Sequence, residues 1–536
     1  MVRGTFLITS GAYAGPDFVS TFGFLPPAFL PIGNRRLYEL HAELTAGTDS
    51  RKILSVPEDF MIEDHERARL MTLGFDIIPV KTDISLGASI AQVLETGEVT
   101  SGKLEILHGD TYIFELPADK TDIVSEGTSS DYYAWAEYRV HPSGRIAFFD
   151  SLMAGQSAAR GGVRSVLSGY FCFDDANLYR TALATSDYQF VPSLNTYSKT
   201  RPLQPVQTGR WLDFGHLDRY YKSRADITTE RAFNSMEISR GSVRKSSKDP
   251  FKMTAETDWF ESLPRTLKTF TPQFLGTHAD NGRTGYETEH LFLSPLSDLH
   301  VFGRLPAFVW QRIFHSCDAF LTACRNHRPG NSLINCEVLY HEKTLARLDL
   351  FSQQSGTSLS DGWRYEGQPM PGLQDIAEQC AKAIPAASQN HLQIMHGDFC
   401  FSNIFYDFRA DTIRVVDPRG YVADGHPTIF GDIRYDIAKL YHSVIGEYDS
   451  IISGVYALEG ETSHDLVLNF PQTAHRLQRQ TDFRQRTFGG LGIPESAAEP
   501  ISVLLFLSML PLHDDRPDRQ LAFLANALRL FQGLDT

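Results

Sequence analysis

Short apolar runs alternate with amphipathic stretches through residues 1–225. Thr5–Thr9, Lys52–Val56 and Asp76–Pro79 each predict a strand. The spacing of Asp64–Leu73 predicts a helix between the second and third of these runs. Because strands that alternate with helices build mostly parallel sheets, we expect a Rossmann-like α/β domain with ligands at the carboxyl ends of its strands.

The pattern changes near residue 226, where we place the start of a second domain, 226–536. A strand-rich small lobe is expected over about 232–292 and a mainly helical lobe over about 293–536. The expected elements are strands at Phe233–Ser239, Ser242–Ser246 and Gly285–Leu293, and helices at Thr254–Leu263 and Pro306–Cys324.

Charge and composition narrow the possible partners. The 536 residues include 50 Lys and Arg and 65 Asp and Glu, a net charge of −15, so nucleic acid is not an expected partner. The six cysteines form no CxxC pair, which favours buried thiols and a reducing cytoplasm. The longest apolar run, Ile501–Leu512, is too short to span a membrane and predicts a core helix.

The strongest motif is His396-Gly397-Asp398-Phe-Cys-Phe-Ser-Asn403, followed by an apolar strand that ends at Asp417. Phosphoryl transfer needs a carboxylate to orient the attacking hydroxyl and oxygen ligands to hold Mg²⁺ on the phosphates. The spacing from Asp398 to Asn403 is that of the protein-kinase catalytic loop. This ordered set therefore points to a phosphotransferase.

The same residues resemble the aminoglycoside phosphotransferase and choline kinase family, whose signature is H-G-D-x-x-x-x-N. The resemblance implies a bilobal kinase-like fold in which Asp398 is the catalytic base and Asn403 and Asp417 bind Mg²⁺. It further implies that His396 braces the loop and that Arg419 contacts a phosphate.

Two further features of that family are expected in this chain. The segment Gly-Asp432-Ile-Arg-Tyr-Asp436-Ile-Ala is similar to the family's G-D-x-x-x-D-L-A, and both aspartates are interpreted as supports for the loop. In the small lobe, Lys245 is the candidate for binding the ATP phosphates. Glu256 is its expected partner, with Glu261 as the alternative.

The first domain resembles the sugar-phosphate nucleotidyltransferases over most of residues 1–225. Four stretches carry the resemblance: Pro26–Asn34, Leu107–Asp110, Ser168–Phe173 and Trp211–His216. The resemblance implies that Asp110 and Asp213 bind the Mg²⁺ that bridges a nucleoside triphosphate and the attacking phosphate. Backbone amides of the turn that contains Ser10, Gly11 and Gly15 would face the triphosphate.

The first domain departs from that family at the phosphate loop. The family pattern is A-A-G-x-G-x-R followed by P-K, whereas this chain has no G-x-G and has Pro27 where the lysine belongs. The cations that could compensate are Arg35, Arg36, Arg160 and Arg164. Two interpretations stay open, a divergent working enzyme and a domain that only binds its ligand.

Together the two resemblances imply a bifunctional enzyme. The second domain would use ATP and Mg²⁺ to phosphorylate a small hydroxylated acceptor, a sugar or an amino-alcohol. The first would transfer a nucleotidyl group from CTP or UTP to that phosphate, giving an NDP-sugar or CDP-alcohol. By analogy this indicates cell-surface or capsule polysaccharide synthesis. The alternatives are a kinase with an inactive nucleotide-binding first domain and a non-catalytic nucleotide-binding scaffold.

Overall fold

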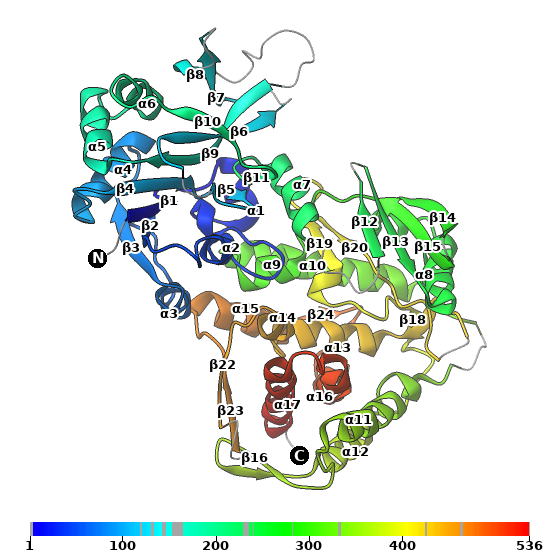
Figure 1. The fold of residues 1–536 in the computed structure, drawn as a ribbon. Helices are drawn as coiled ribbons and strands as arrows, with labels where there is room; N and C mark the ends of the chain where they lie inside the picture. The colour runs from blue at the N-terminus through cyan, green and yellow to red at the C-terminus, as the bar shows by residue number, and fades with distance from the viewer. Residues whose placement is uncertain are drawn as a thin grey trace. The chain divides into compact units, whose positions relative to one another are not determined.

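The chain divides into two compact units, Met1–Ile227 and Thr228–Thr536, and each is described by itself (Figure 1). The computed structural model describes residues 4–117, 120–129, 133–141, 146–152, 164–228, 235–239, 241–280, 282–330, 334–423, 426–460 and 465–534.

A seven-stranded sheet forms the centre of the first unit. In spatial order its strands are β10 (Gln204–Gln207), β6 (Ile123–Ser129), β9 (Arg164–Phe173), β4 (Lys103–His108), β1 (Gly4–Thr9), β2 (Arg51–Pro57) and β3 (Phe75–Val80). Strand β9 runs antiparallel to β4 and β6, whereas β4, β1, β2 and β3 are mutually parallel. The predicted mostly parallel sheet is therefore present.

Helices and two smaller strand pairs complete this unit. Its helices are α1 (Pro16–Phe22), α2 (Leu37–Leu44), α3 (Asp64–Thr72), α4 (Leu86–Thr96), α5 (Ala176–Thr185), α6 (Phe190–Ser198) and α7 (Leu217–Thr228). The short antiparallel pairs are β5 (Thr111–Ile113) with β11 (Trp211–Asp213), and β7 (Trp135–Val140) with β8 (Ile146–Leu152). Strand β1 buries Phe6, Leu7 and Ile8 completely, as expected for a strand covered on both faces.

The order of the central strands determines where a ligand can bind. From β1 the chain moves to β2 and β3 on one side, then returns to β4 on the other side of β1. The carboxyl ends of β1 and β4 lie side by side, since Thr9 is in register with His108. Ligands of open α/β sheets bind at such a switch point. The loops that begin at Ser10 and Gly109 both start there.

A four-stranded antiparallel sheet and one helix begin the second unit. The strand order is β12 (Ser235–Ile238), β13 (Ser242–Ser247), β15 (Arg283–Glu289) and β14 (Phe274–Asp280), and α8 spans Pro250–Ser262. Helix α8 begins four residues before the predicted Thr254 because the Asp249 carboxylate accepts the Lys252 N–H and caps it. The sequence prediction missed β14.

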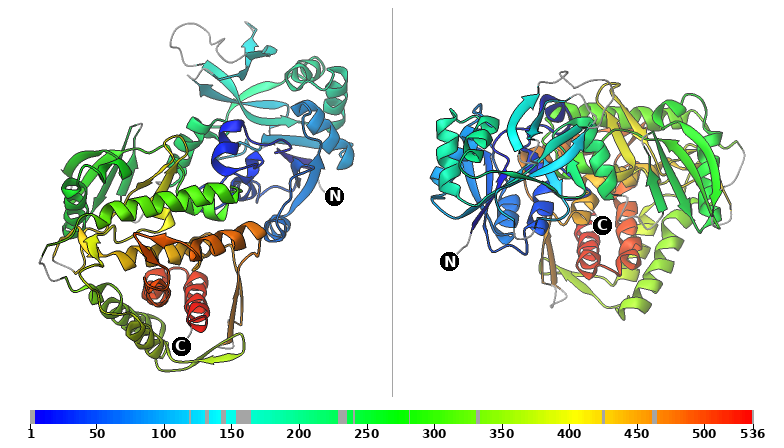
Figure 2. Two further views of the ribbon diagram at one scale, coloured as in Figure 1. Left: turned by 180° about the vertical axis from the view of Figure 1, so that it is seen from behind. Right: turned by 45° about the horizontal axis from the view of Figure 1, so that its top comes forward.

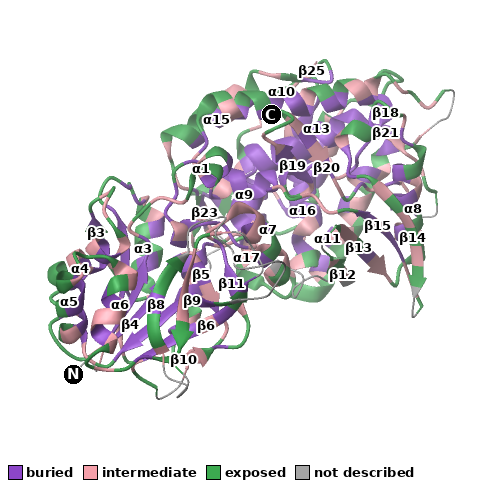
Figure 3. Ribbon diagram, turned by 90° about the horizontal axis from the view of Figure 1, so that it is seen from above, coloured by how far each residue is buried: buried purple, intermediate pink, exposed green. Residues whose placement is uncertain are grey.

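The rest of the second unit is mainly helical, as predicted. Its longer helices are α10 (Ala307–Arg325), α11 (His341–Ser355), α12 (Leu373–Ala383), α13 (Ile433–Val444), α15 (Ala474–Arg484), α16 (Ala498–Met509) and α17 (Pro517–Gln532). Figure 2 shows α16 and α17 in red, packed side by side. Every residue of α13 is buried, and Figure 3 shows burial concentrated along α13 and α16. These two helices are therefore the core of this lobe.

Short helices and strands connect the long helices. They are α9 (Leu296–Val301), α14 (Tyr448–Ile452), β16 (Trp363–Tyr365), β17 (Gln368–Met370), β18 (Leu392–Ile394), β19 (Ile404–Asp407), β20 (Thr412–Val415), β21 (Phe430–Asp432), β22 (Ala457–Glu459), β23 (Asp465–Asn469), β24 (Thr487–Phe488) and β25 (Leu491–Gly492). Strands β17, β16, β23 and β22 form a small sheet that the sequence analysis did not anticipate.

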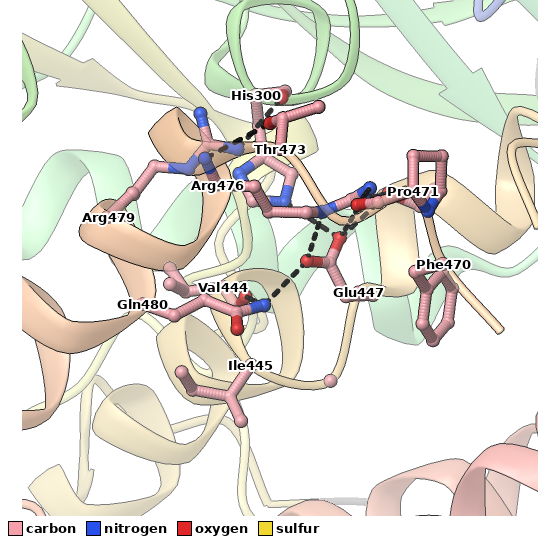
Figure 4. A network of polar contacts seen from close by, with 12 residues as sticks. His300, Val444, Ile445, Glu447, Phe470, Pro471, Thr473, Arg476, Arg479 and Gln480 are labelled. Atoms are coloured by element: carbon pink, nitrogen blue, oxygen red, sulfur yellow. Dashed lines mark hydrogen bonds and ion pairs between the residues drawn. The ribbon is translucent and has the colours of Figure 1, made fainter. Parts of the chain in front are cut away.

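A buried ionic network centred on Glu447 joins α9, α14 and α15 (Figure 4). The Arg476 Nε donates to one Glu447 carboxylate oxygen at 2.7 Å, and Gln480 donates to the same oxygen at 2.8 Å. The His300 ring nitrogen lies 3.1 Å from the other oxygen. Burial alone would raise the pKa of Glu447, but Arg476 and His300 together outweigh it and hold that pKa well below the ordinary range. Glu447 therefore stays ionised inside the protein.

Replacing Glu447 with alanine is expected to lower the free energy of unfolding by about 3–5 kcal/mol, since Arg476 loses its buried partner. Urea unfolding followed by circular dichroism measures the change. Glu459→Ala, at an exposed position on β22, is the matched control and should change the free energy by less than about 0.5 kcal/mol. Equal stability of the two variants would contradict the structural role of the network.

The six cysteines are free and buried, as the sequence predicts. Among the helices that the structure describes, none has the length and apolarity needed to cross a bilayer. The apolar run at Ile501–Leu512 lies within α16 and the following turn of helix, in the core of the helical lobe.

Candidate active sites

Two loops of the second unit bring Asp398, Asn403 and Asp417 to one region. Asp398 follows β18, and Asn403 immediately precedes β19. Strands β19 and β20 form an antiparallel hairpin, and beyond its last pair the Val416 N–H donates to the Asn403 carbonyl at 3.0 Å. Asp417, the next residue, is consequently held beside the Asp398–Asn403 loop.

The Asp398 carboxylate has a defined partner on each oxygen. The Asn403 amide nitrogen donates to one oxygen at 2.9 Å, and the Lys439 ammonium lies 2.8 Å from the other. Partial burial would raise the pKa of Asp398, but Lys439 outweighs it and holds the pKa well below the ordinary carboxyl range. Asp398 is therefore an ionised, fixed carboxylate, suited to orient a hydroxyl group.

Asp436 and His396 fix the backbone of this loop. The two Asp436 oxygens accept the N–H groups of His396 and Gly397, both at 2.8 Å. The Asp398 N–H donates to the His396 ring at 3.3 Å. Burial lowers the pKa of His396 to about 4, so the neutral ring can accept that bond. These contacts are those expected of loop supports.

Asp432 supports the same region from the start of α13. Its carboxylate accepts the Arg434 N–H as the helix cap and forms a buried ion pair with the Arg434 guanidinium at 2.7 Å. The Tyr340 hydroxyl donates to it at 3.2 Å. Asp432 thus orients the helix that carries Asp436 and Lys439.

The small lobe supplies a buried lysine at the same cavity. Lys245 lies on β13, and its ammonium is 2.7 Å from the Glu256 carboxylate and 3.1 Å from Asp417. Burial alone would lower the pKa of Lys245, but Asp417 and Glu256 raise it overall, so the ammonium stays charged. Glu261, the alternative partner, is exposed near the end of α8. The pairing is therefore with Glu256.

The donor atoms at this site fit a magnesium ion. The Asp417 side chain is 48% exposed, and Asn403 uses its amide nitrogen on Asp398, which leaves its amide oxygen as the ligand atom. Carboxylate and amide oxygens suit Mg²⁺, which takes its other ligands from phosphates and water. In the described ranges no group of three or more His, Cys, Asp or Glu residues could hold a metal by itself.

One cavity of about 350 Å³ is lined by Lys245, Glu256, Asp398, Asp417 and Lys439. Asn403 is bonded to Asp398 at its edge. Arg419 lines it too: its N–H donates to the His396 carbonyl at 2.8 Å, and its guanidinium lies 4.4 Å from the centre of the Tyr421 ring. The cavity and the Asn403 amide beside it therefore bring together an oriented carboxylate, two oxygen ligands and a buried lysine, which are the parts that phosphoryl transfer needs.

In the first unit, Asp110 and Asp213 face each other across a glycine. Asp110 follows β4 and Asp213 ends β11; the Phe214 N–H donates to the Asp110 carbonyl at 2.7 Å. A Cβ atom at Gly215 would lie 2.6 Å from an Asp110 oxygen and 3.2 Å from an Asp213 oxygen. Burial, with the charge of Asp213, raises the pKa of Asp110 to about 6. Two crowded carboxylates are a donor set that fits Mg²⁺.

The Asp213 carboxylate also contacts an arginine and a histidine. The Arg219 Nε is 3.0 Å from an Asp213 oxygen, and the His216 ring nitrogen is 3.2 Å from the same oxygen. The Arg219 guanidinium packs on Trp135 and Trp211. Arg219 therefore already balances part of the negative charge that a bound metal would neutralise.

The loop after β1 differs from a loop whose backbone N–H groups all face a bound phosphate. The Ser10 N–H donates to the Ser55 hydroxyl at 3.0 Å, so this amide is occupied. A Cβ atom at Gly11 would lie 2.3 Å from a Val80 methyl group, which explains the glycine. Gly15 precedes α1. The structure thus places Gly11 at the switch point, while the Ser10 amide is directed into the sheet.

Two of the compensating arginines are held elsewhere. Arg35 forms an ion pair with Glu43, and Arg36 is buried in an ion pair with Glu66 at 2.5 Å. Arg36 is therefore not available to a phosphate group, contrary to that suggestion. Arg160 lies outside the described residues, as does the side chain of Arg164.

Sequence reasoning missed three cations. Lys439 is three residues after Asp436 on α13, a spacing that shares one helix face and could have indicated it. Lys343 and Arg347, four residues apart on α11, also line the cavity. Nothing in their local sequence distinguishes them from surface cations, because only tertiary packing brings α11 to the site.

Replacing Lys439 with methionine should introduce an acid limb into the pH profile of phosphoryl transfer. In the native protein the depressed pKa keeps Asp398 ionised, so its contribution is lost only far below neutrality. Without Lys439, burial is opposed only by the weaker effects of His396 and Arg419, so that pKa rises and kcat should begin to fall at a higher pH than in the native protein. Lys382→Met, at an exposed position on α12, should keep the native profile. Identical profiles for Lys439→Met and the native protein would contradict the assigned role.

Comparison with known proteins gives structural neighbours for each part. No family model and no curated protein matches the chain. HddC from Yersinia pseudotuberculosis is 17% identical, with 42% of this chain and 99% of that chain covered and a TM-score of 0.32. The inositol-1-phosphate CTP transferase from T. maritima is 15% identical, with 43% and 98% covered and a TM-score of 0.33.

Other neighbours are aminoglycoside phosphotransferases. A thermostable mutant of aminoglycoside phosphotransferase APH(4)-Ia is 14% identical, with 55% of this chain and 88% of that chain covered and a TM-score of 0.33. The nucleotidyltransferase neighbours match the N-terminal part and the phosphotransferases match the C-terminal part. The sheets and helices of the two units confirm the predicted α/β fold class. The neighbours include both kinds of protein that the sequence resembles.

Proposed function

We propose that the chain is a bifunctional enzyme that phosphorylates a small hydroxylated acceptor with ATP and then transfers a nucleotidyl group to the new phosphate. The observation that carries the proposal is the shared cavity of Asp398, Asp417 and Lys245. In it, a carboxylate positioned by Asn403 and Lys439 faces the same space as a buried lysine paired with Glu256.

In the kinase reaction Lys245 would bind the phosphates of ATP, and Asp398 would orient the acceptor hydroxyl. That oxygen attacks the γ-phosphorus, the bond to the β-phosphate oxygen breaks, and ADP leaves. The hydroxyl proton passes to Asp398 or to water as the new bond forms. Asn403 and Asp417 would hold the magnesium ion, which neutralises charge on the transferring phosphoryl group.

In the second reaction the phosphate made by the kinase would attack the α-phosphorus of CTP or UTP. The bond from the α-phosphorus to the β-phosphate oxygen breaks and pyrophosphate leaves. Asp110 and Asp213 would hold a metal that polarises the reacting phosphates. Their place at the β1–β4 switch point supports this assignment, because ligands of such sheets bind there.

A second candidate function is a kinase whose first unit binds a nucleotide without catalysis. Three observations favour it: Arg219 already pairs with Asp213, the Ser10 amide is bonded to Ser55, and Arg36 is buried against Glu66.

For the bifunctional enzyme, the pairing of the two reactions suggests, by analogy, a role in cell-surface polysaccharide synthesis.

The test uses the full-length chain with ATP, Mg²⁺ and a panel of sugars and amino-alcohols, with CTP or UTP added in parallel. ADP and pyrophosphate are measured separately. The two-step enzyme is supported if one acceptor leads to release of both ADP and pyrophosphate, and if pyrophosphate is released only when ATP is present. ADP without pyrophosphate for every triphosphate favours the second candidate. Neither product with any acceptor overturns the proposed activity.

A further inference from the structure

The cavity around Asp398 carries more cations than the kinase reaction requires. Six cationic side chains line it: Lys245, Lys252, Lys343, Arg347, Arg419 and Lys439. Three carboxylates line it: Glu256, Asp398 and Asp417. All three are already paired, with Lys245 or Lys439. The remaining cations thus present uncompensated charge to the cavity.

Two of these cations lie on one face of α11. The Lys343 ammonium donates to the Tyr435 hydroxyl at 2.7 Å, and the Arg347 guanidinium donates to the Ser508 carbonyl at 3.0 Å. In the portion of the chain that the structure describes, neither forms an ion pair with a carboxylate. Burial lowers the pKa of Lys343 to about 8, and the nearby charges of Arg419 and Lys439 add to this effect. An anion bound here would reduce the repulsion among the positive charges of Lys343, Arg419 and Lys439.

The α11 cations belong to the acceptor end of the cavity. Lys245 and Glu256 come from β13 and α8 of the small lobe, where Asp417 also contacts Lys245. Lys343 and Lys439 instead lie 5.1 Å and 6.0 Å from the centre of the Tyr435 ring. Because Lys439 also contacts Asp398, this ring links the catalytic carboxylate to α11. An acceptor hydroxyl at Asp398 would place the rest of that molecule toward Lys343 and Arg347.

We propose that the acceptor is a small anionic molecule with a hydroxyl group, and that Lys343 and Arg347 bind its carboxylate or phosphate group. The inference rests on the proposed kinase function and names its substrate class. A guanidinium and an ammonium four residues apart on one helix face suit an oxyanion. The same charges repel a cationic acceptor, so choline and ethanolamine are disfavoured.

The test compares matched acceptors in the full-length protein with ATP and Mg²⁺, measuring ADP. The pairs are glycerol against glycerate and glycerol 3-phosphate, and glucose against glucuronate and glucose 6-phosphate, with choline and ethanolamine as cationic members. We expect kcat/KM to be at least about 10-fold higher for the anionic members. The carboxylate and phosphate arms show which anion the site prefers.

Substitutions on α11 locate the anion site. In Lys343→Met and Arg347→Met, the KM for the anionic acceptor should rise by about 10- to 100-fold, with the KM for ATP within about twofold of the native value. Arg347→Lys keeps the charge and should recover part of the loss. Lys382→Met removes a lysine of α12 that does not line the cavity, and it should behave as the native protein.

Three outcomes would overturn the inference. One is turnover confined to neutral or cationic acceptors. Another is an equal rise of both KM values, which would assign the α11 cations to the nucleotide phosphates. The third is that the native protein binds neither glycerol 3-phosphate nor glucuronate in a calorimetric titration.

The same titration tests the anion site independently of the kinase activity. If no acceptor releases ADP, the proposed kinase activity fails, but the anion site is still supported when the native protein binds these anions and Lys343→Met and Arg347→Met do not.

Discussion

Asp398→Asn is expected to reduce kcat for acceptor phosphorylation by about 10²- to 10⁴-fold, the range that general acid–base groups contribute. An amide at this position can still accept a hydrogen bond from Lys439. It cannot take the hydroxyl proton, and it lacks the charge that orients the hydroxyl toward the γ-phosphate. The KM for ATP should stay near the native value, because Lys245 and Asp417 remain in place. ADP release at saturating acceptor measures the effect.

Two controls make this result specific. Pyrophosphate release by the first unit, assayed with acceptor that is already phosphorylated, should be unchanged in Asp398→Asn. Asp361→Asn, an exposed position between α11 and β16, should retain full kinase activity. Native kcat in Asp398→Asn would show that another group orients the hydroxyl, and the assignment of Asp398 would be wrong.

Asp213→Asn should lower pyrophosphate release by more than about 100-fold and leave ADP release unchanged. Outer partners of metal sites alone contribute about 10- to 100-fold, so loss of a ligand should exceed that range. The substitution also removes the charge opposite Arg219, which lies 3.0 Å from the carboxylate. A melting temperature measured alongside activity separates this structural effect from the catalytic one.

The matched control is Asp187→Asn, at an exposed turn between α5 and α6. It should keep the native rate of pyrophosphate release. A native protein that releases pyrophosphate, together with an equally active Asp213→Asn variant, would exclude Asp213 from the reaction. A stable Asp213→Asn variant that still binds CTP or UTP but releases no pyrophosphate would favour the ligand role.

The loop from Asp398 to Asn403 could be predicted from sequence because its parts are close along the chain. Asp398 and Asn403 share one loop, and the hairpin of β19 and β20 brings Asp417 back beside them by local pairing alone. Strands β1 to β4 could be predicted for a related reason. Strands β1, β2 and β4 are buried over most of their length, so their apolar runs are nearly continuous and stand out from the helices between them. Strand β3, at the edge of the sheet, is partly exposed but still has the apolar pair Ile77 and Ile78.

Other features depend on tertiary contacts that no local pattern encodes. Strand β14 contains Thr277, His278 and Asp280, and its pairing with β15 rather than its own composition makes it a strand. The Lys343–Tyr435 contact joins residues of α11 and α13 that are 92 positions apart. The position of Arg219 between two tryptophans likewise depends on where β7 and β11 meet α7.

The order of the two units along the chain determines when each can fold during synthesis. The sheet of the first unit takes all seven strands from residues 4–207, so it can form while the ribosome is still translating the second unit. The cavity around Asp398, by contrast, is lined in part by Leu505, Ser508 and Leu512, and α17 packs against the helix and the helical turn that carry them. The sheet of the first unit can therefore form early, whereas the cavity around Asp398 is complete only once α16 and α17 have been made.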